Sequence, residues 1–504
     1  MSKAKVAVCP YCCKKFNPSA MWFRMEKYEQ EEEDIALDDV DQSGSGEVDE
    51  YLKRYFMEYE QMSPANAENA ARQRSGGKPA ICIDIANDSR KISDYNEKML
   101  YEYGFVTELT YEGQRLTKRL CPHCHNEVVR GAGLYEMKLI AMYGDTNAGK
   151  TVFLSVLEAM LKGDPRLGEY TGAFHGMMSF QGTDQEREQH LLEYERLIKD
   201  KVLYDATTAG ARVAPRAFRF SYRTAENAGR DRDLLLVFCD IAGEDTRSLG
   251  GLQRSGFYLR NVDGIITLLD ATRLTNVSPY LHGTIDGENV GDVALRAEEA
   301  LTNLSTYLDG IKISIPTAVV VTKLDVLKSI SMVAEDPEFS KIIYASGANN
   351  IHQKFLDKKT ITDMNRAVQK MLQKLGGELF CNTVEHCFSR FNYFAVSALG
   401  RAPEKKVIVN DFGEETVIKQ VSGSLEPFRV TEPFYWILAQ CNCIPYRYQE
   451  VWQDKKGKEK DIEVKFYYYE SERAGIAQQQ LQKIRESKIK KPKRWELVDR
   501  LNRL

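Results

Sequence analysis

The segment Gly144–Thr151 carries the clearest chemical pattern in the 504 residues of the chain. It matches the phosphate-binding loop G-x-x-x-x-G-K-[ST] at every fixed position. Glycines let such a loop curl until successive backbone N–H groups converge on phosphate oxygens. We expect Lys150 to reach the β- and γ-phosphates, and the Thr151 hydroxyl to ligate Mg²⁺. The expected nucleotide contacts here are Gly144, Asp145, Asn147, Ala148, Gly149, Lys150 and Thr151.

A second chemical element lies downstream, where the apolar run 234–239 ends in Asp-x-x-Gly. A carboxylate at the end of such a strand is a hard oxygen ligand of the kind that Mg²⁺ prefers. We therefore expect Asp240 to hold the metal, through a water molecule. We expect the Gly243 N–H to contact the terminal phosphate, because glycine permits a close backbone approach.

A third element separates guanine from adenine. The apolar run 315–321 is followed by Thr-Lys-Leu-Asp, which fits [NT]-K-x-D. The Asp325 carboxylate can accept from both N1–H and the 2-amino group of guanine, whereas adenine offers neither donor and would leave the charge unpaired. Lys323 would lie along the base plane. The expected base contacts are Thr322, Lys323 and Asp325, with the backbone N–H groups of Ser397 and Ala398 directed at guanine O6.

These motifs, in this order, resemble those of TRAFAC-class P-loop GTPases. Over roughly residues 135–445 the chain is most similar to the bacterial double-GTPase (DO-GTPase) group, whose members are often linked to zinc ribbons and to conflict and defence systems. The resemblance implies Mg²⁺–GTP binding and a regulatory switch, and it supplies no substrate.

Two features depart from a simple switch GTPase. Both Thr207 and Thr208 are candidates for the threonine that ligates Mg²⁺ only in the triphosphate state, and we favour Thr208. Glu244 follows the Asp-x-x-Gly motif where many switch GTPases carry a water-orienting glutamine. It could act as a base or face solvent, so we expect slow hydrolysis that a partner or dimerisation stimulates. Arg247 and Arg254 are candidates for an arginine finger, although surface arginines are commonly only solvated.

Two C-P-x-C pairs predict a zinc site. Each pair, Cys9 with Cys12 and Cys121 with Cys124, resembles a zinc knuckle that presents two thiolates at Zn–S bonding distance. Together they make a four-cysteine structural site, although their separation far exceeds that of an ordinary zinc ribbon. Cys13, His123 and His125 are alternative ligands, and reduced cysteines that never meet are the competing interpretation.

An acidic stretch separates the two pairs. Residues 39–50 fit a calcium-loop pattern except for a glycine at its eighth position. A register that starts at Asp41 places Val48 there but has Leu52 in place of the closing glutamate, and an acidic flexible loop is the favoured interpretation. We expect the acidic stretch to be an insertion, at about residues 26–77, that loops out of the zinc module, with a polar, loop-rich segment up to about Gly77.

The elements that must carry these motifs follow from the alternation of strand-like and helical patterns after Tyr135, which predicts a parallel sheet. The expected strands are Met137–Tyr143, Ala217–Tyr222, Leu234–Asp240, Gly264–Asp270, Thr317–Thr322 and Tyr393–Val396. The expected helices are Thr151–Leu161, Asp184–Lys201, Gly287–Leu308, Asp363–Leu375 and Thr431–Ala439. The fold class is therefore α/β: a P-loop NTPase G domain with a mostly parallel central sheet and helices on both faces, plus an N-terminal zinc-ribbon-like module.

The expected domains are a zinc-ribbon-like module over residues 1–134, a GTPase domain over 135–445 and a basic extension over 446–504. Insertions are expected in the GTPase domain at about 163–215 and 330–390. The extension ends on the amphipathic stretch Trp495–Leu504, a candidate docking helix for a protein effector, as is the zinc module. Acidic residues interrupt its basic clusters, so a solvated segment is favoured over a nucleic-acid patch.

A net charge of -4 argues against bulk attraction to nucleic acid or an anionic membrane. The sequence has no apolar run of membrane-spanning length and no signal-peptide core, so we expect a cytoplasmic protein. The leading hypothesis is a Mg²⁺-dependent GTP switch that slowly hydrolyses GTP to GDP. The alternatives are an ATP-using P-loop protein and a zinc-ribbon adaptor whose G domain binds nucleotide without hydrolysis.

Overall fold

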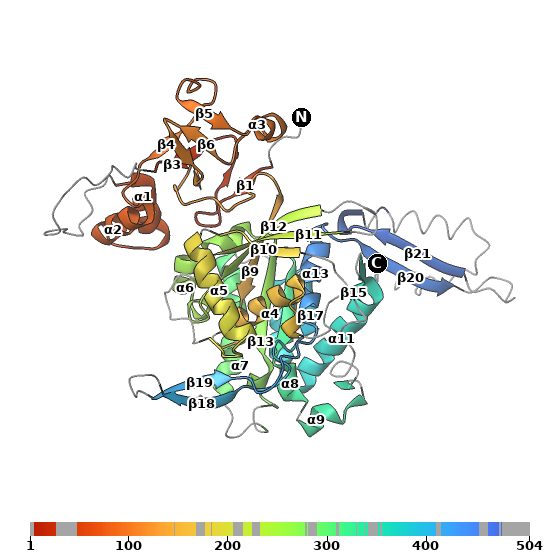
Figure 1. The fold of residues 1–504 in the computed structure, drawn as a ribbon. Helices are drawn as coiled ribbons and strands as arrows, with labels where there is room; N and C mark the ends of the chain where they lie inside the picture. The colour runs from red at the N-terminus through yellow and green to blue at the C-terminus, as the bar shows by residue number, and fades with distance from the viewer. Residues whose placement is uncertain are drawn as a thin grey trace.

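The computed structural model describes residues 5–26, 48–145, 147–167, 177–182, 184–204, 215–223, 232–277, 280, 290–308, 312–328, 330–337, 339–340, 351–352, 355–409, 415–452, 462–472 and 475. A seven-stranded sheet forms the centre of the molecule (Figure 1). In spatial order its strands are β10 (Met177–Phe180), β11 (Arg216–Tyr222), β12 (Arg232–Asp240), β9 (Glu136–Tyr143), β13 (Gly264–Asp270), β14 (Thr317–Thr322) and β17 (Phe391–Ala395). The five strands from β12 to β17 are parallel, while β10 and β11 are antiparallel additions at one edge.

Alternate side chains of the central strands enter two separate cores, one on each face of the sheet. In β9, Leu139, Ala141 and Tyr143 belong to one buried cluster, while Ile140 and Met142 belong to the other. Near-continuous apolar strands of this kind are typical of a parallel sheet that is covered on both sides.

Helices cover both cores. The first face carries α6 (Leu249–Ser255), α7 (Val290–Tyr307), α11 (Lys358–Lys374) and α12 (Glu378–Cys387). The second carries α4 (Lys150–Lys162), α5 (Asp184–Ile198) and α13 (Thr431–Gln440). The sequence-based prediction of a mostly parallel α/β sheet with helices on both faces is confirmed.

The N-terminal region forms small sheets and two packed helices on one side of the central sheet (Figure 1). Its strands are β1 (Ala7–Val8), β2 (Lys15–Phe16), β3 (Trp22–Arg24), β4 (Ala80–Cys82), β5 (Ile92–Tyr95), β6 (Leu109–Tyr111), β7 (Gln114–Leu116) and β8 (Arg119–Leu120). Its helices are α1 (Glu50–Tyr59), α2 (Pro64–Ser75) and α3 (Glu97–Tyr103). The Tyr59 ring meets Phe257 at a centroid distance of 5.0 Å, so this region touches the segment that follows α6.

The expectation of a loop-rich segment up to Gly77 is wrong, because α2 occupies most of it, and α1 lies at the end of the acidic stretch before it. Asp49 caps α1 by accepting from the N–H groups of Tyr51 and Leu52, and Ser63 caps α2 ahead of Pro64. Leu52, Tyr55 and Phe56 of α1 are buried. Asp49 also pairs with Arg24 and His125, and as the eleventh residue of the candidate calcium loop 39–50 it is not at a ligand position of that loop. Residues 39–47 of that candidate loop lie outside the described part of the chain.

Further strands lie outside the main sheet. The hairpin β18 (Glu404–Val409) and β19 (Glu415–Gln420) follows the expected base loop and projects from the body (Figure 1). Its base pairs with the segment after α5, where the Leu203 N–H donates to Lys419 O at 2.8 Å. A four-stranded sheet joins β15 (Ile351–His352) and β16 (Phe355–Asp357) to β20 (Tyr446–Trp452) and β21 (Ile462–Tyr468), so the beginning of the expected C-terminal extension packs against residues of the 330–390 interval.

The six predicted central strands are all present, two with the predicted bounds and four shifted by at most two residues. The helix predicted over Asp363–Leu375 begins five residues earlier, at Lys358, because Asp357 caps it by accepting from the Thr360 N–H. The candidate docking helix Trp495–Leu504 lies outside the described residues. Among the residues that are described, every helix is too short or too polar to cross a membrane.

Candidate nucleotide site and cysteine cluster

Every nucleotide motif that the structure describes lies at the carboxyl edge of the parallel strands. The phosphate loop follows β9, Asp240 ends β12, Asp270 ends β13, Thr322 ends β14 and Ser397 follows β17. Parallel strands end at the same edge, so residues far apart in sequence converge there, as ligand sites of open α/β sheets commonly do.

The phosphate loop depends on glycine at both ends. Gly144 has φ +138°, and a Cβ at this position would lie 2.5 Å from Leu268 O. Gly149 has φ +87° and caps α4, which begins at Lys150. Asn147 adopts φ +63°, a left-handed conformation that asparagine tolerates better than most residues. The backbone is therefore bent into a loop that ends at a helix N-terminus, which is the geometry that favours anions.

Lys150 is buried, and its ammonium folds back over the loop. It donates to Gly144 O at 2.9 Å and to Asp145 O at 3.4 Å. Burial lowers the pKa of Lys150, while the charges of Asp240 and Asp145 act in the opposite direction. A buried ammonium is costly unless it is paired with opposite charge, so Lys150 is suited to bind the phosphate of a nucleotide.

Asp240 faces the same region from the end of β12. Burial raises the pKa of its carboxyl, and the charge of Lys150 partly offsets that effect. Its Oδ1 is buried and has no hydrogen-bond partner among the described residues. A buried carboxylate oxygen left unpaired costs free energy, so this atom has the chemistry of a ligand for a metal ion or its water shell.

The expected base motif forms a turn beside the loop after β17. Lys323 adopts φ +58°, and Leu324 donates its N–H to Val396 O at 3.1 Å. The Ser397 hydroxyl donates to Asp325 Oδ1 at 2.5 Å. Thr322 Oγ1 donates to Ala148 O at 3.1 Å, so the base motif is tied directly to the phosphate loop. Ala398 follows the buried Ser397 and is partly buried.

The structure describes only some of the residues expected to form the switch. Gly243 is buried and Glu244 is exposed at the start of the turn Asp245–Arg247. Arg254 is more than half exposed and lies 3.5 Å from Asp245. Thr207 and Thr208 lie outside the described residues, so the choice between them stays a prediction.

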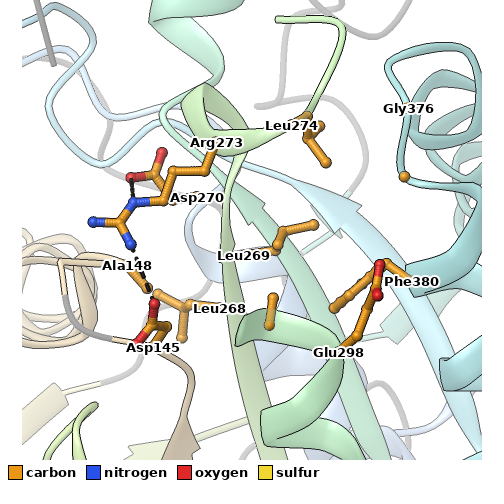
Figure 2. Close-up of a pocket in the computed structure, with 12 residues that line it drawn as sticks. Asp145, Ala148, Leu268, Leu269, Asp270, Arg273, Leu274, Glu298, Gly376 and Phe380 are labelled. Atoms are coloured by element: carbon orange, nitrogen blue, oxygen red, sulfur yellow. Dashed lines mark hydrogen bonds and ion pairs between the residues drawn. The ribbon is translucent and has the colours of Figure 1, made fainter. Parts of the chain in front are cut away.

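The sequence reasoning missed Asp270 and Arg273. Arg273 Nη1 lies 3.2 Å from Asp145 Oδ2, and its Nε lies 3.4 Å from Asp270 Oδ2 (Figure 2). Asp270 Oδ2 also pairs with Lys323 at 2.5 Å. The signals available in the sequence were an acid at the carboxyl end of a predicted strand and the three-residue spacing of Asp270 and Arg273, whereas Asp145 and Lys323 are distant in sequence. A pocket adjoins these pairs and is lined on its apolar side by Leu268, Leu269, Leu274, Ala297 and Phe380 (Figure 2).

The four predicted cysteines converge in the N-terminal region. All four sulfurs of Cys9, Cys12, Cys121 and Cys124 lie within 4.8 Å of one another and are buried. The Cys9–Cys124 and Cys12–Cys121 sulfurs are 3.6 and 3.9 Å apart. A tetrahedron with Zn–S bonds of about 2.3 Å has edges of about 3.8 Å, whereas a disulfide needs about 2.05 Å. The cluster therefore fits a tetrahedral metal site rather than disulfides.

The two cysteine pairs adopt the same turn. The Cys13 N–H donates to Cys9 O at 2.8 Å, and the His125 N–H donates to Cys121 O at 2.9 Å. The residue after each pair has a left-handed backbone, with φ +56° at Cys13 and +52° at His125. The backbone N–H of His123 also donates to Cys121 Sγ at 3.4 Å. This repeated geometry is the physical basis of a two-knuckle module.

The alternative ligands are not part of the cluster. His125 Nδ1 lies 2.9 Å from Asp49, and His123 Nε2 lies 3.2 Å from Lys15 O. Cys13 is buried but belongs to the turn rather than to the group of four. The idea that the cysteine pairs never meet is wrong, because the strands and helices between them return the chain to the first knuckle.

Comparisons with known proteins give a family. The family model described as Double-GTPase 2 matches residues 138–400. A curated protein of Mycolicibacterium smegmatis, provisionally named ESX-1 scaffolding and assembly protein SaeC, is 24% identical over 341 residues, covering 66% of this chain and 82% of that protein.

Solved structures that are similar include two GTPase structures. One is the signal recognition particle receptor SRb-GTP/SRX complex from Chaetomium thermophilum, with 14% identity, 53% of this chain and 93% of that chain covered, and a TM-score of 0.22. Another is the Arl6 BBS3 small GTPase from Trypanosoma brucei, with 13% identity, 60% and 95% covered, and a TM-score of 0.23. The assignment rests on the family model, which spans the phosphate loop, Asp240–Gly243, the Thr322–Asp325 motif and Ser397. The chain belongs to the Double-GTPase 2 family and is a GTP-binding P-loop protein.

Proposed function

We propose that this protein is a Mg²⁺-dependent switch that binds GTP and slowly hydrolyses it to GDP. The observation that carries the proposal is Oδ1 of Asp240, which is buried without a hydrogen-bond partner in the described part of the chain, together with the buried ammonium of Lys150, which interacts electrostatically with that carboxylate. A metal ion and a triphosphate would satisfy both groups at once.

Each motif has a role in this proposal. The loop from Gly144 to Thr151 holds the phosphates by its backbone, and Lys150 neutralises charge on the β- and γ-phosphates. Asp240 and Thr151 hold Mg²⁺, which supplies further charge neutralisation when it is bound. The Gly243 N–H would donate to the γ-phosphate, so the position of the turn that follows would depend on whether that phosphate is present.

Guanine selection rests on Asp325, which accepts from two donors that adenine lacks. Its bond from Ser397 fixes the direction of the carboxylate, which supports this role. Lys323 packs along the base, and the N–H groups of Ser397 and Ala398 face O6. The same residues argue against the ATP-using alternative.

Hydrolysis is the in-line attack of water on the γ-phosphate. Glu244 is exposed, and its carboxylate replaces the neutral amide that orients water in many switch GTPases. We therefore propose a low intrinsic rate, on the order of 10⁻⁴ to 10⁻² s⁻¹. Thr208 is proposed as the threonine that senses the triphosphate state.

The cysteine cluster is proposed to hold one structural Zn²⁺, because all four positions of a tetrahedron are taken by protein sulfur. Four ionised sulfurs this close together in a buried cluster would repel one another strongly, so they require a cation. The similarity to a protein named for scaffolding and assembly supports a further proposal, that the switch controls a protein assembly. The link to defence stays an expectation from the family resemblance.

Phosphate release from Mg²⁺–GTP tests the proposal. The full-length chain should release phosphate above the level of Lys150→Ala, and EDTA should abolish the difference. GTP binding without release above that control would favour the non-hydrolysing adaptor instead. Release from ATP at an equal or higher rate would favour the ATP-using alternative.

A further inference from the structure

Five charged side chains form a continuous series of ion pairs across the nucleotide site. Arg247 Nε lies 3.0 Å from Asp145 Oδ1, and Arg273 bridges Asp145 and Asp270 at 3.2 and 3.4 Å. Lys323 Nζ closes the series at 2.5 Å from Asp270 Oδ2. The signs alternate along the whole series, so each inner charge has an opposite charge on both sides.

The series joins three motifs that are far apart in sequence. Arg247 lies in the turn after Asp240–Gly243, Asp145 lies in the phosphate loop, and Lys323 lies in the base motif. Arg273 belongs to none of these motifs, because it ends the short helix that follows β13. Its guanidinium is the one group in the series that contacts both carboxylates (Figure 2).

The interior of this series is shielded from water. The Asp145, Asp270 and Arg273 side chains are 9%, 4% and 14% exposed, whereas Lys323 and Arg247 at the two ends are 38% and 32% exposed. Charge pairs interact more strongly where water is excluded. The interactions among the inner charges are therefore screened less by water than those at the two exposed ends.

Each carboxylate is also held in one orientation. The two oxygens of Asp145 pair with different arginines, and Asp270 Oδ1 accepts hydrogen bonds from the hydroxyl and the N–H of Thr272. Asp270 Oδ2 is shared between Lys323 and Arg273. A shift of Lys323 would therefore change how Arg273 divides its contacts between Asp270 and Asp145, and with it the pairing of Asp145 with Arg247.

We propose that Arg273 is a positioning residue that couples guanine recognition at Lys323 to the switch turn at Arg247 through Asp270 and Asp145. This inference rests on the proposed guanine-nucleotide function. Base binding is thereby reported to the switch turn through Asp145 of the phosphate loop, so that the turn after Gly243 tightens only over a correctly seated guanine nucleotide.

Hydrogen exchange of the full-length chain saturated with Mg²⁺–GDP tests this coupling, with occupancy measured on the same samples. Lys323→Met should accelerate exchange in peptides covering residues 243–256 by about 2- to 30-fold, the range of couplings carried by such networks. In an Arg273→Gln background, where exchange is already faster, Lys323→Met should add nothing. Arg273→Lys keeps the charge but reaches one carboxylate at a time, so it should retain folding and lose most of the coupling.

Arg166→Gln is the matched control, because Arg166 also bridges two acids, Asp164 and Glu195, away from the nucleotide motifs. It should leave exchange over 243–256 unchanged. An equal effect of Lys323→Met with and without the Arg273→Gln substitution overturns the coupling, as does no effect in either background. Failure of the wild-type chain to bind GDP would instead remove the proposed function, and this inference with it.

Discussion

The Ser397 hydroxyl donates to Asp325 Oδ1 at 2.5 Å across 72 residues of sequence. Ser397 is itself fully buried and exchanges two backbone hydrogen bonds with Phe428, at 3.1 and 2.7 Å. The carboxylate proposed to read guanine is therefore held by a residue that cannot rotate freely. Such preorganisation lowers the ordering cost of binding a base.

Ser397→Ala should weaken GDP binding about 10-fold or more, because hydrogen bonds to charged groups contribute about 1.5–3 kcal/mol. The backbone N–H proposed for guanine O6 is unchanged by this substitution, so the loss isolates the orientation of Asp325. Titration calorimetry measures it, with Ser424→Ala as a control, since that exposed serine bonds to Glu426. Equal GDP affinity in Ser397→Ala and wild type would contradict this role.

Gly144→Ala and Gly149→Ala should differ sharply in their effects on folding. A Cβ at Gly144 would lie 2.5 Å from the backbone oxygen of Leu268, whereas one at Gly149 has nothing within 4 Å. Gly149→Ala incurs the left-handed backbone strain of about 1–2 kcal/mol, while Gly144→Ala must also displace β13. Thermal melting should show a clearly larger loss of stability for Gly144→Ala than for Gly149→Ala. Similar losses would contradict this prediction, because they would mean that β13 shifts at little cost.

Asp240→Asn should stabilise the nucleotide-free protein while weakening Mg²⁺–GTP binding. Burial raises the folded-state pKa of Asp240, so its ionised form costs stability as pH rises above the ordinary carboxyl value. The substitution should raise the melting temperature at pH 8, with a smaller gain at pH 5. Its Mg²⁺-dependent GTP affinity should fall at least about 10-fold, or 1.4 kcal/mol.

Those two effects of Asp240→Asn must appear together. A variant that loses stability without Mg²⁺ would show that the carboxylate makes favourable contacts in the free protein. One that keeps wild-type Mg²⁺ dependence would remove Asp240 from the metal site.

Zinc content should separate the clustered cysteines from their neighbour. Wild-type protein should hold about one zinc per chain, and Cys121→Ser should hold little, since removing one thiolate opens the site. Cys13→Ser is the matched control, because Cys13 is buried next to the cluster but outside it. Elemental analysis of the purified proteins measures both; normal zinc in Cys121→Ser would be inconsistent with the four-sulfur site.

Zinc loss should also affect the switch region. Tyr59 of α1 contacts Phe257, which follows α6, so a loosened zinc module removes packing from the segment that leads on from the turn after Gly243. Chelation should therefore accelerate proteolytic cleavage near residues 249–261 of the intact chain. Cleavage that is unaffected by chelator, in protein that has lost its zinc, would show that the two regions are independent.

The central sheet was predictable because its strands are short apolar runs with sharp polar boundaries. Gly264–Asp270 and Thr317–Thr322 have the bounds that the pattern indicates, since a glycine, a proline or an acid punctuates each run. The motif residues follow directly from those strand ends. The antiparallel edge strand β10 is not expected from the sequence, because it lies inside a long polar insertion.

Helices α1 and α2 show where composition misleads. Their polar, acidic sequence favours a loop, although Leu52, Tyr55 and Phe56 have helical spacing and Ser63-Pro64 is a helix-start signal. The ion pair between Arg273 and Asp145 could not be foreseen. It joins residues that are 128 positions apart, and the register of β13 beside β9 brings them together.

The most direct test of the account is the nucleotide preference of Asp325→Asn. Wild-type protein should bind GTP at least about 100-fold more tightly than ATP or xanthosine triphosphate, and titration calorimetry measures all three. The variant should lose GTP affinity by about 10-fold or more, as expected when a charge-assisted pair is lost, and gain affinity for xanthosine triphosphate, whose 2-oxo group accepts from the new amide. Unchanged GTP binding, with no gain for xanthosine triphosphate, would contradict guanine recognition at this site.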